Sequence, residues 1–309
     1  MTPPPASQPA RPVAAPAPTS FRTGLAAGAA AYAAWGVVPL YWHLLAAIAP
    51  IEILAHRAVW GLVAFLVMAV VTGQGPAIGA AVRDRRVVLA LATSATLLAI
   101  NWGLFIWATL AGHLLQASLG YFINPLVSVA LGVTFLGERL RRWQLIAIVL
   151  AAVGVILLAG AGDGVPWVSL VLAGSFGSYG LVRKVAPVAA LAGSTIETAM
   201  MAPFGVAYLI YLAATGGGAL GHIDLADTLL LLSAGVVTAV PLAWFTVAAR
   251  RLPLSVVGFL QYLAPTGQFL TAVIAFHEPL ADAKLLAFAF IWAGLAVFSA
   301  DLALASRRG

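Results

Sequence analysis

The most constraining feature of this 309-residue chain is where its basic residues lie relative to its apolar segments. Ten apolar runs follow one another, and each is about 17–25 residues long, enough to cross a bilayer core as a helix. Of the 16 Lys and Arg residues, 14 lie in alternate gaps or tails, whereas the other gaps contain only Lys284. The positive-inside rule therefore predicts an all-α integral membrane protein with ten transmembrane helices and both termini in the cytoplasm. The runs are 24–45, 52–73, 86–109, 113–136, 142–160, 165–184, 193–215, 226–249, 255–276 and 281–304.

The composition supports a membrane protein and excludes several other classes. Hydrophobic residues make up 62% of the chain and charged residues 8%, whereas soluble domains carry about 25% charged residues. The net charge of +6 lies in short loops that would face anionic headgroups, and none of these loops is long enough for a nucleic-acid groove. The absence of Cys and the scattered His residues predict no metal or other cofactor. The expected partners are membrane lipid and a small-molecule substrate, and the sequence carries no signal for an oligomeric state.

The two ends of the chain differ from the rest. Residues 1–21 contain seven prolines among Ala and Ser, so they cannot bury enough apolar surface to offset the entropy of ordering. We expect a disordered cytoplasmic tail there, a second short tail at 306–309, and an uncleaved first span.

An internal repeat relates the two halves of the chain at an offset of 140 residues. It divides the sequence into 22–161 and 162–305, each with five predicted spans. Because five is odd, the second copy would enter the membrane upside down, as in alternating-access transporters with a central site between the repeats. The clearest matched pairs are Pro125 with Pro265, Glu138 with Glu278, and Gly154 with Gly294.

The repeat predicts a secondary transporter, and the alternative is a small-solute channel or facilitator. Kinked helices with polar and aromatic side chains favour an occluding carrier. No P-loop is present, so ATP is not the direct driver. A membrane-embedded enzyme is disfavoured because Ser118 and Ser255 have no nearby Lys or His base in the sequence.

Two prolines at matched positions indicate where polar groups line the predicted site. Pro125 leaves the carbonyl of Tyr121 without its helical donor, and Pro265 does the same for Gln261. Asn124 lies on the same helical face as Tyr121. In lipid, such carbonyls need a partner from protein, water or ligand. The alternative is that both prolines only bend helices for packing.

The second span contains the charged residues that point most directly to function. Glu52 lies in its first turn, and His56 follows on the same face. Arg57 is the only Arg that lies inside an apolar run and away from its ends. A charge at that depth requires a partner or a water-filled cavity, unless it snorkels to the surface. Glu197, at the repeat position equivalent to Arg57, is expected at the inner mouth. Glu52, His56 and Glu197 are candidates for gating or for carrying a coupling proton, and uncoupled exchange is equally open.

Several neutral polar and aromatic residues also fall inside spans. Asn101 would either line the site or hydrogen-bond between helices for packing. An inner aromatic set could line a cavity or pack in the core: Trp35, Trp102, Tyr179 and Tyr262. A second set is expected in the interfacial belts: Tyr41, Trp42, Trp107, Trp143 and Trp167.

The chain contains several long motifs, among them Glu-Ile-Leu-Ala-His-Arg from residue 52, Ala-Ser-Leu-Gly-Tyr-Phe-Ile-Asn-Pro-Leu from residue 117 and Phe-Leu-Gln-Tyr-Leu-Ala-Pro-Thr from residue 259. With these motifs the chain resembles the RarD family of EamA-type permeases in the drug/metabolite transporter superfamily. The resemblance covers about 22–305 and implies ten spans, a bacterial inner-membrane location, and export or exchange of small metabolites or drugs. The family-typical residues fall on Glu52, His56, Arg57, Asn101, Trp102, Tyr121, Asn124, Pro125, Gln261, Tyr262 and Pro265.

Two positions depart from the family pattern. Gln116 stands where many members carry Glu, which argues against a proton carrier there. His277-Glu278-Pro279 replaces the usual Gly-Glu, so a different outer turn is expected.

Overall fold

The computed structural model describes residues 18–136, 141–158, 165–252 and 260–306, and every element it describes is a helix. The bounds, in chain order, are α1 Pro18–Leu44, α2 Pro50–Val71, α3 Gly75–Arg83, α4 Arg85–Leu110, α5 Leu114–Leu136, α6 Arg142–Leu158, α7 Trp167–Val185, α8 Ala190–Thr215, α9 Leu225–Arg251, α11 Leu263–Leu270, the π-helical η2 Thr271–Ala275 and α12 Asp282–Ser306.

Each predicted apolar run overlaps a helix in the described part of the chain, but within 255–276 the described helices are the short α11 and η2. Six of these helices are long and apolar enough to cross a membrane, namely α1, α2, α4, α8, α9 and α12, and the bent α5 raises the number to seven. The shorter apolar helices are α6 and the pair α11–η2. The described residues thus form a multi-pass helical membrane protein by length and composition. The helix α3 was not expected, because it occupies a gap between two apolar runs.

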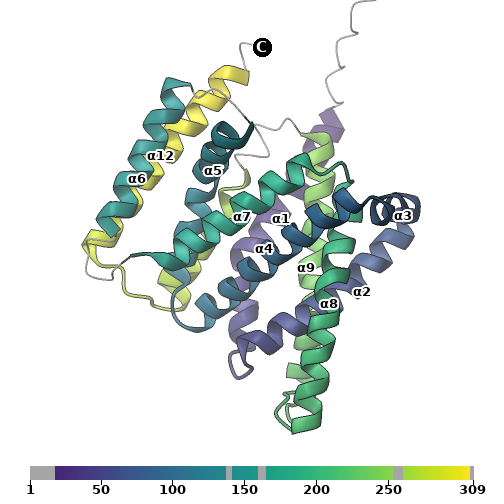
Figure 1. The fold of residues 1–309 in the computed structure, drawn as a ribbon. Coiled ribbons are helices and arrows are strands. Elements are labelled where there is room, and N and C mark those ends of the chain that lie inside the picture. Colours follow the sequence, from purple (N-terminus) through teal and green to yellow (C-terminus); the bar gives the residue numbers. More distant parts are fainter. Residues whose placement is uncertain (1–17, 137–140, 159–164, 253–259, 307–309) are drawn as a thin grey trace, which may run out of the picture.

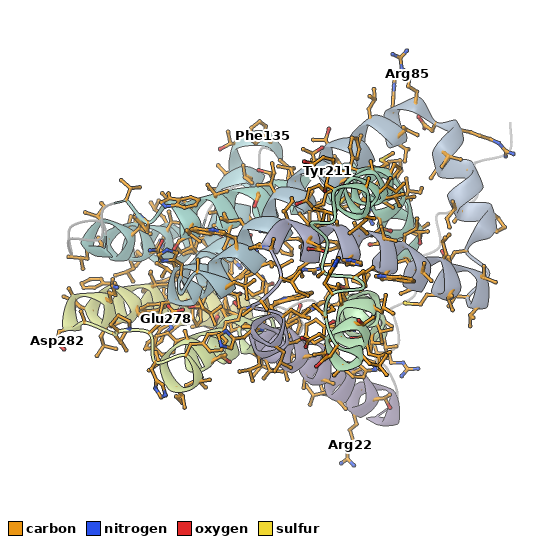
Figure 2. The ribbon with its side chains drawn as sticks, turned by 90° about the horizontal axis from the view of Figure 1, so that it is seen from below. Arg22, Arg85, Phe135, Tyr211, Glu278 and Asp282 are labelled. Carbon is orange, nitrogen blue, oxygen red and sulfur yellow. The ribbon has the colours of Figure 1, made fainter. Side chains whose placement is uncertain are left out.

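Large apolar side chains cover much of the outer surface. Val70 and Val71 are each 80% exposed and Phe204 is 79% exposed, which is the pattern of a helix bundle that faces hydrocarbon rather than water. Charged residues take two kinds of position: in Figure 2, Arg22 and Arg85 project outward from the ribbon, whereas Glu278 lies within it.

The ends of several helices have a local cause in the sequence. Pro50 begins α2, where a missing N–H costs no helical hydrogen bond. The side chain of Asp84 caps α4 by accepting from the backbone N–H groups of Arg86 and Val87. The helix α8 ends at Gly216, whose φ of 68° suits glycine.

Small residues bring the helices into close contact. The main pairs are α1 with α9, α2 with α8 and α9, α7 with α4 and α5, and α6 with α12; Figure 1 shows α6 and α12 side by side at one edge of the molecule. A Cβ on Gly154 would lie 2.7 Å from the carbonyl oxygen of Ala287. A Cβ on Gly294 would lie 2.7 Å from the carbonyl oxygen of Ala147. Glycine therefore permits backbone-to-backbone packing where α6 and α12 cross.

The two prolines expected to bend helices behave differently. The helix α5 bends by 41° between Leu114–Asn124 and Leu126–Phe135, which places the bend at Pro125. In contrast, Pro265 lies in the first turn of α11, after a turn at Gln261 and Tyr262. A proline in the first turn removes no helical hydrogen bond, so the expected mid-helix kink at Pro265 is not what the structure shows.

The turn before α12 also has an unusual backbone. His277 has a φ of 51° and is the one non-glycine residue with positive φ in the described part of the chain. A side chain at such a φ is strained, whereas glycine adopts it freely. The family pattern of Gly-Glu fits this turn better than the His277-Glu278 of this chain.

The predicted tails lie mostly outside the described residues. The structure describes nothing before Pro18, where α1 begins, so residues 18–21 are helical rather than part of the expected tail. Glu138, the repeat partner of Glu278, also lies outside the described residues.

Candidate functional site

Arg57 is held between two indole rings inside the helix bundle. It lies seven residues after the start of α2, which is about 10 Å along the helix axis. Its guanidinium carbon is 3.9 Å from the ring centroid of Trp102 on α4 and 5.2 Å from that of Trp42 on α1. Both contacts are in the range of cation–π interactions. Three helices thus position one cation.

The charge of Arg57 has no carboxylate partner in the described part of the chain. The ion pairs found there are Arg141–Asp301 and Arg183–Glu197. The titratable groups that interact electrostatically with Arg57 are the hydroxyls of Tyr41 and Tyr121. The Nε of Arg57 is buried without a hydrogen-bond partner, although the residue as a whole is partly exposed.

Tyr121 is oriented by a hydrogen-bond network that joins three helices. Its hydroxyl donates to Oδ1 of Asn101 over 2.8 Å. Nδ2 of Asn101 donates to the carbonyl of Leu172 and to Oγ of Ser175, each at 3.1 Å. Asn101 therefore ties α4 to α5 and α7, which is the packing use of a membrane amide, and fixes the ring of Tyr121 near Arg57.

A second polar cluster surrounds Glu197 on α8, which is fully buried. Oγ of Ser94 on α4 donates to its Oε1 over 2.5 Å, and the hydroxyl of Tyr179 on α7 lies 3.4 Å from Oε2. Nε of Arg183, also on α7, lies 3.7 Å from Oε1. The carboxylate therefore connects α4, α7 and α8. None of these polar partners belongs to the Arg57 cage, which is defined here as Arg57 with Tyr41, Trp42, Trp102 and Tyr121.

Glu52 and His56 share a face of α2 but have different partners. Oε1 of Glu52 accepts a 2.7 Å hydrogen bond from the backbone N–H of Ala219, in the connection between α8 and α9. Nδ1 of His56 accepts from Nε1 of Trp60 over 3.2 Å. Nε2 of His56 is buried without a partner. Glu52 therefore fastens a loop to α2 and is not available to neutralise Arg57 through that oxygen.

The remaining predicted site residues lie outside both clusters. The ring of Trp35 contacts Tyr32 and Phe245, and its carbonyl accepts from Nε2 of Gln268. Tyr262 hydrogen-bonds Ser299 on α12. Asn124 is buried and its Oδ1 has no partner, while Gln261 is partly exposed in the turn before α11. The structure therefore does not gather these residues around Arg57.

Two belt assignments were wrong, because Trp42 and Tyr41 belong to the interior. Trp42 is 1% exposed, and its Nε1 is buried without a partner. The hydroxyl of Tyr41 donates to the carbonyl of Leu230 and contacts Oγ of Ser233 on α9. Position near a helix end did not reveal that both rings face the neighbouring helices. Trp143 and Trp167, which are 51% and 50% exposed, fit a belt.

Sequence reasoning also missed the structural role of Glu278. Its two carboxylate oxygens accept from the backbone N–H groups of Leu114 and Leu115 at 2.7 and 2.9 Å, and so cap α5 from a distant segment. A cavity of about 320 Å³ beside it is lined by residues that include Gln116 and Lys284. It shares no lining residue with the Arg57 cage. The repeat match of Glu138 with Glu278 indicated that Glu278 matters, but it did not indicate which backbone groups Glu278 would bind.

Comparisons with known proteins agree with this architecture. Residues 22–160 match the EamA-like transporter family. The chain is 42% identical to the protein RarD of Streptomyces exfoliatus, over 93% of this chain and 91% of that protein. It is 44% identical to an uncharacterized transporter of Pseudomonas aeruginosa, over 94% and 98%. A solved crystal structure of a protein that is 18% identical superposes with a TM-score of 0.59, over 90% of this chain and 97% of that one, and so supports the fold alone.

Proposed function

This chain belongs to the EamA-like transporter family as a RarD-type permease, and from this membership in a family of membrane transporters we propose the finer mechanism of a secondary transporter. It moves small metabolites or drugs across the bacterial inner membrane by alternating access. The substrate site lies in the bundle interior between two inverted five-helix repeats, with both termini in the cytoplasm.

The observation that carries the proposal is the reciprocal packing of α6 and α12. Gly154 faces the carbonyl of Ala287, and Gly294 faces the carbonyl of Ala147. The offset of 140 residues relates Gly154 to Gly294 and Ala147 to Ala287, so each contact is the repeat equivalent of the other. Such an exchange is what a two-fold relation between repeats produces, and inverted repeats are typical of alternating-access carriers.

Other helix pairs support the same relation. The offset pairs α1 with α7, α2 with α8, α4 with α9 and α5 with α11. Under this exchange the α1–α9 contact corresponds to α7–α4, the α1–α11 contact to α7–α5, and the α2–α9 contact to α8–α4. The family match at 22–160 covers almost the same residues as the first proposed repeat.

The two polar clusters receive different roles in this proposal. The Arg57 cage is the substrate site. Its side chains come from the first repeat, and Tyr41 joins it to α9 of the second repeat through Leu230 and Ser233. The Glu197 cluster is the inner gate, because one carboxylate holds α4, α7 and α8 together near the basic end of α7. Opening that end requires the three contacts to separate, and protonation of Glu197 would weaken its ion pair with Arg183. Glu197 is therefore also the proposed carrier of a coupling proton.

Counterflow in proteoliposomes tests the mechanism. A thermal-shift screen of metabolites on the purified full-length protein supplies ligands, and the uptake of each labelled ligand is then measured with and without the same unlabelled ligand inside. A carrier takes up label faster when the inside is loaded, because the loaded site reorients in both directions. Uptake that internal ligand does not stimulate would indicate a channel or facilitator instead.

A further inference from the structure

We propose that the Arg57 cage binds the carboxylate of the transported substrate, and that the substrate is a small organic acid with one negative charge and an apolar or aromatic body. The inference rests on the proposed function and names the substrate class of the same site.

Arg57 retains a hydrogen-bond donor that no group in the described part of the chain accepts. The guanidinium carbon of Arg57 lies 3.9 Å from the ring centroid of Trp102 and 5.2 Å from that of Trp42. These cation–π contacts use no N–H donor as a hydrogen bond. Nε of Arg57 and Nε1 of Trp42 are both buried donors without a partner in the described part of the chain. Two unpartnered donors on side chains that contact each other define an acceptor site.

The positive charge of Arg57 has no carboxylate partner in the described part of the chain. Two described carboxylates are related to Arg57, Glu52 by sequence and Glu197 by its equivalent position in the repeat, and both have other partners. Glu52 accepts from the backbone N–H of Ala219. Glu197 accepts from Ser94 and pairs with Arg183. The hydroxyls of Tyr41 and Tyr121, which do interact with Arg57, are neutral donors or acceptors. An ionised guanidinium that is held among neutral groups at membrane depth is costly. A bound anion removes that cost.

The single charge and the N–H geometry of one guanidinium select the kind of anion that fits. Guanidinium binds carboxylate and phosphate through parallel N–H donors. A phosphate monoester carries about −1.5 to −2 charges at neutral pH, which is more than one Arg neutralises, and the groups that interact electrostatically with Arg57 include no second cation in the described part of the chain. A zwitterionic amino acid would place its ammonium among groups that offer no free carboxylate. A monocarboxylate matches the single charge, and the indole and phenol rings match an apolar body.

Charged thiol reagents measure this property directly and do not require an identified substrate. The chain contains no Cys, so Tyr121→Cys places one thiol beside Arg57. The rate of modification is compared for anionic 2-sulfonatoethyl methanethiosulfonate and cationic 2-(trimethylammonium)ethyl methanethiosulfonate, each divided by its rate with 2-mercaptoethanol. We expect the anionic reagent to be favoured at least tenfold. Arg57→Gln should abolish the preference, and Arg57→Lys should retain most of it. Thr72→Cys, an exposed site beyond α2, is the control and should not respond to Arg57→Gln.

A second measurement separates the carboxylate from anions in general. Benzoate should slow the modification of Tyr121→Cys in the presence of Arg57, and the isosteric neutral benzamide should not. Equal protection by both compounds, or equal rates for the two reagents, would overturn the anionic substrate while leaving a water-accessible transport site in place. If neither reagent modifies Tyr121→Cys from either face, the cage is closed to solutes, and the proposed central site fails with it.

Discussion

Arg57 is the residue whose placement is hardest to explain by stability alone. An Arg near the middle of a membrane helix costs about 2.5–3.5 kcal/mol on insertion scales, whereas each cation–π contact returns about 0.5–2 kcal/mol. The described neighbours supply two such contacts and no carboxylate. Groups that a protein retains at a cost to stability are often the ones that act on a ligand.

This balance gives a prediction for the ligand-free protein. Arg57→Gln removes the charge and keeps a shorter polar side chain, so the melting temperature in detergent should be equal to or higher than that of the wild type. Ligand-induced stabilisation should disappear in the same variant. A clear fall in the melting temperature of the ligand-free protein would mean that protein groups already neutralise the guanidinium.

The interior position of Arg57 could be expected from the sequence, but its partners could not. One Arg in an apolar run of about 22 residues is anomalous in any fold. The indole of Trp42, in contrast, belongs to a helix whose rotation relative to α2 depends on tertiary packing. Its residue type and its position near a helix end fitted an interfacial belt equally well.

At the scale of secondary-structure elements, the start of α5 depends on a distant carboxylate. Glu278 accepts from the N–H groups of Leu114 and Leu115, donors that a helix N-terminus otherwise leaves free. Glu278→Ala should destabilise the protein by about 0.5–2 kcal/mol, the usual cost of losing an N-cap. Glu278→Gln, which keeps one acceptor oxygen, should cost less. Thermal melting of both variants checks the order, and equal values would argue against the cap.

The crossing of α6 and α12 gives a matched pair of predictions. A methyl group on Gly154 or on Gly294 would lie 2.7 Å from a carbonyl oxygen of the facing helix, so each Gly→Ala change should cost about 1–3 kcal/mol by overpacking. Gly180→Ala on α7 is the control, because a Cβ there would meet nothing within 4 Å. Similar losses at the two equivalent positions are expected, and melting curves that show a loss at one position only would contradict the reciprocal packing.

The positions of the long helices were predicted better than the breaks within them. Apolar runs and basic gaps located the described helices apart from α3, because the bilayer fixes helix length. Pro125 produced the expected bend within α5. Pro265 does not bend a helix as Pro125 does, because the turn at Gln261 and Tyr262 places Pro265 in the first turn of α11. The sequence alone could not reveal where that helix begins.

At the scale of the whole molecule, the distribution of charge predicts the orientation in the membrane. The tails and alternate gaps hold 14 of the 16 basic residues, which favours cytoplasmic termini. A C-terminal fusion to alkaline phosphatase should therefore be inactive, and a C-terminal fusion to green fluorescent protein should fluoresce. An active phosphatase fusion would reverse the topology and with it the assignment of the Glu197 cluster to the inner end.

The central claim is that one interior site opens to each side of the membrane in turn, and side-specific cysteine labelling tests it most directly. Single cysteines replace Tyr121, which interacts with Arg57 in the proposed site, or Asn124, one turn further along α5, and a membrane-impermeant maleimide is applied to right-side-out and to inside-out vesicles. We expect each cysteine to be labelled from both faces of the membrane and to be protected by a transported ligand. Labelling of neither position from either face, or from one face only, would contradict alternating access.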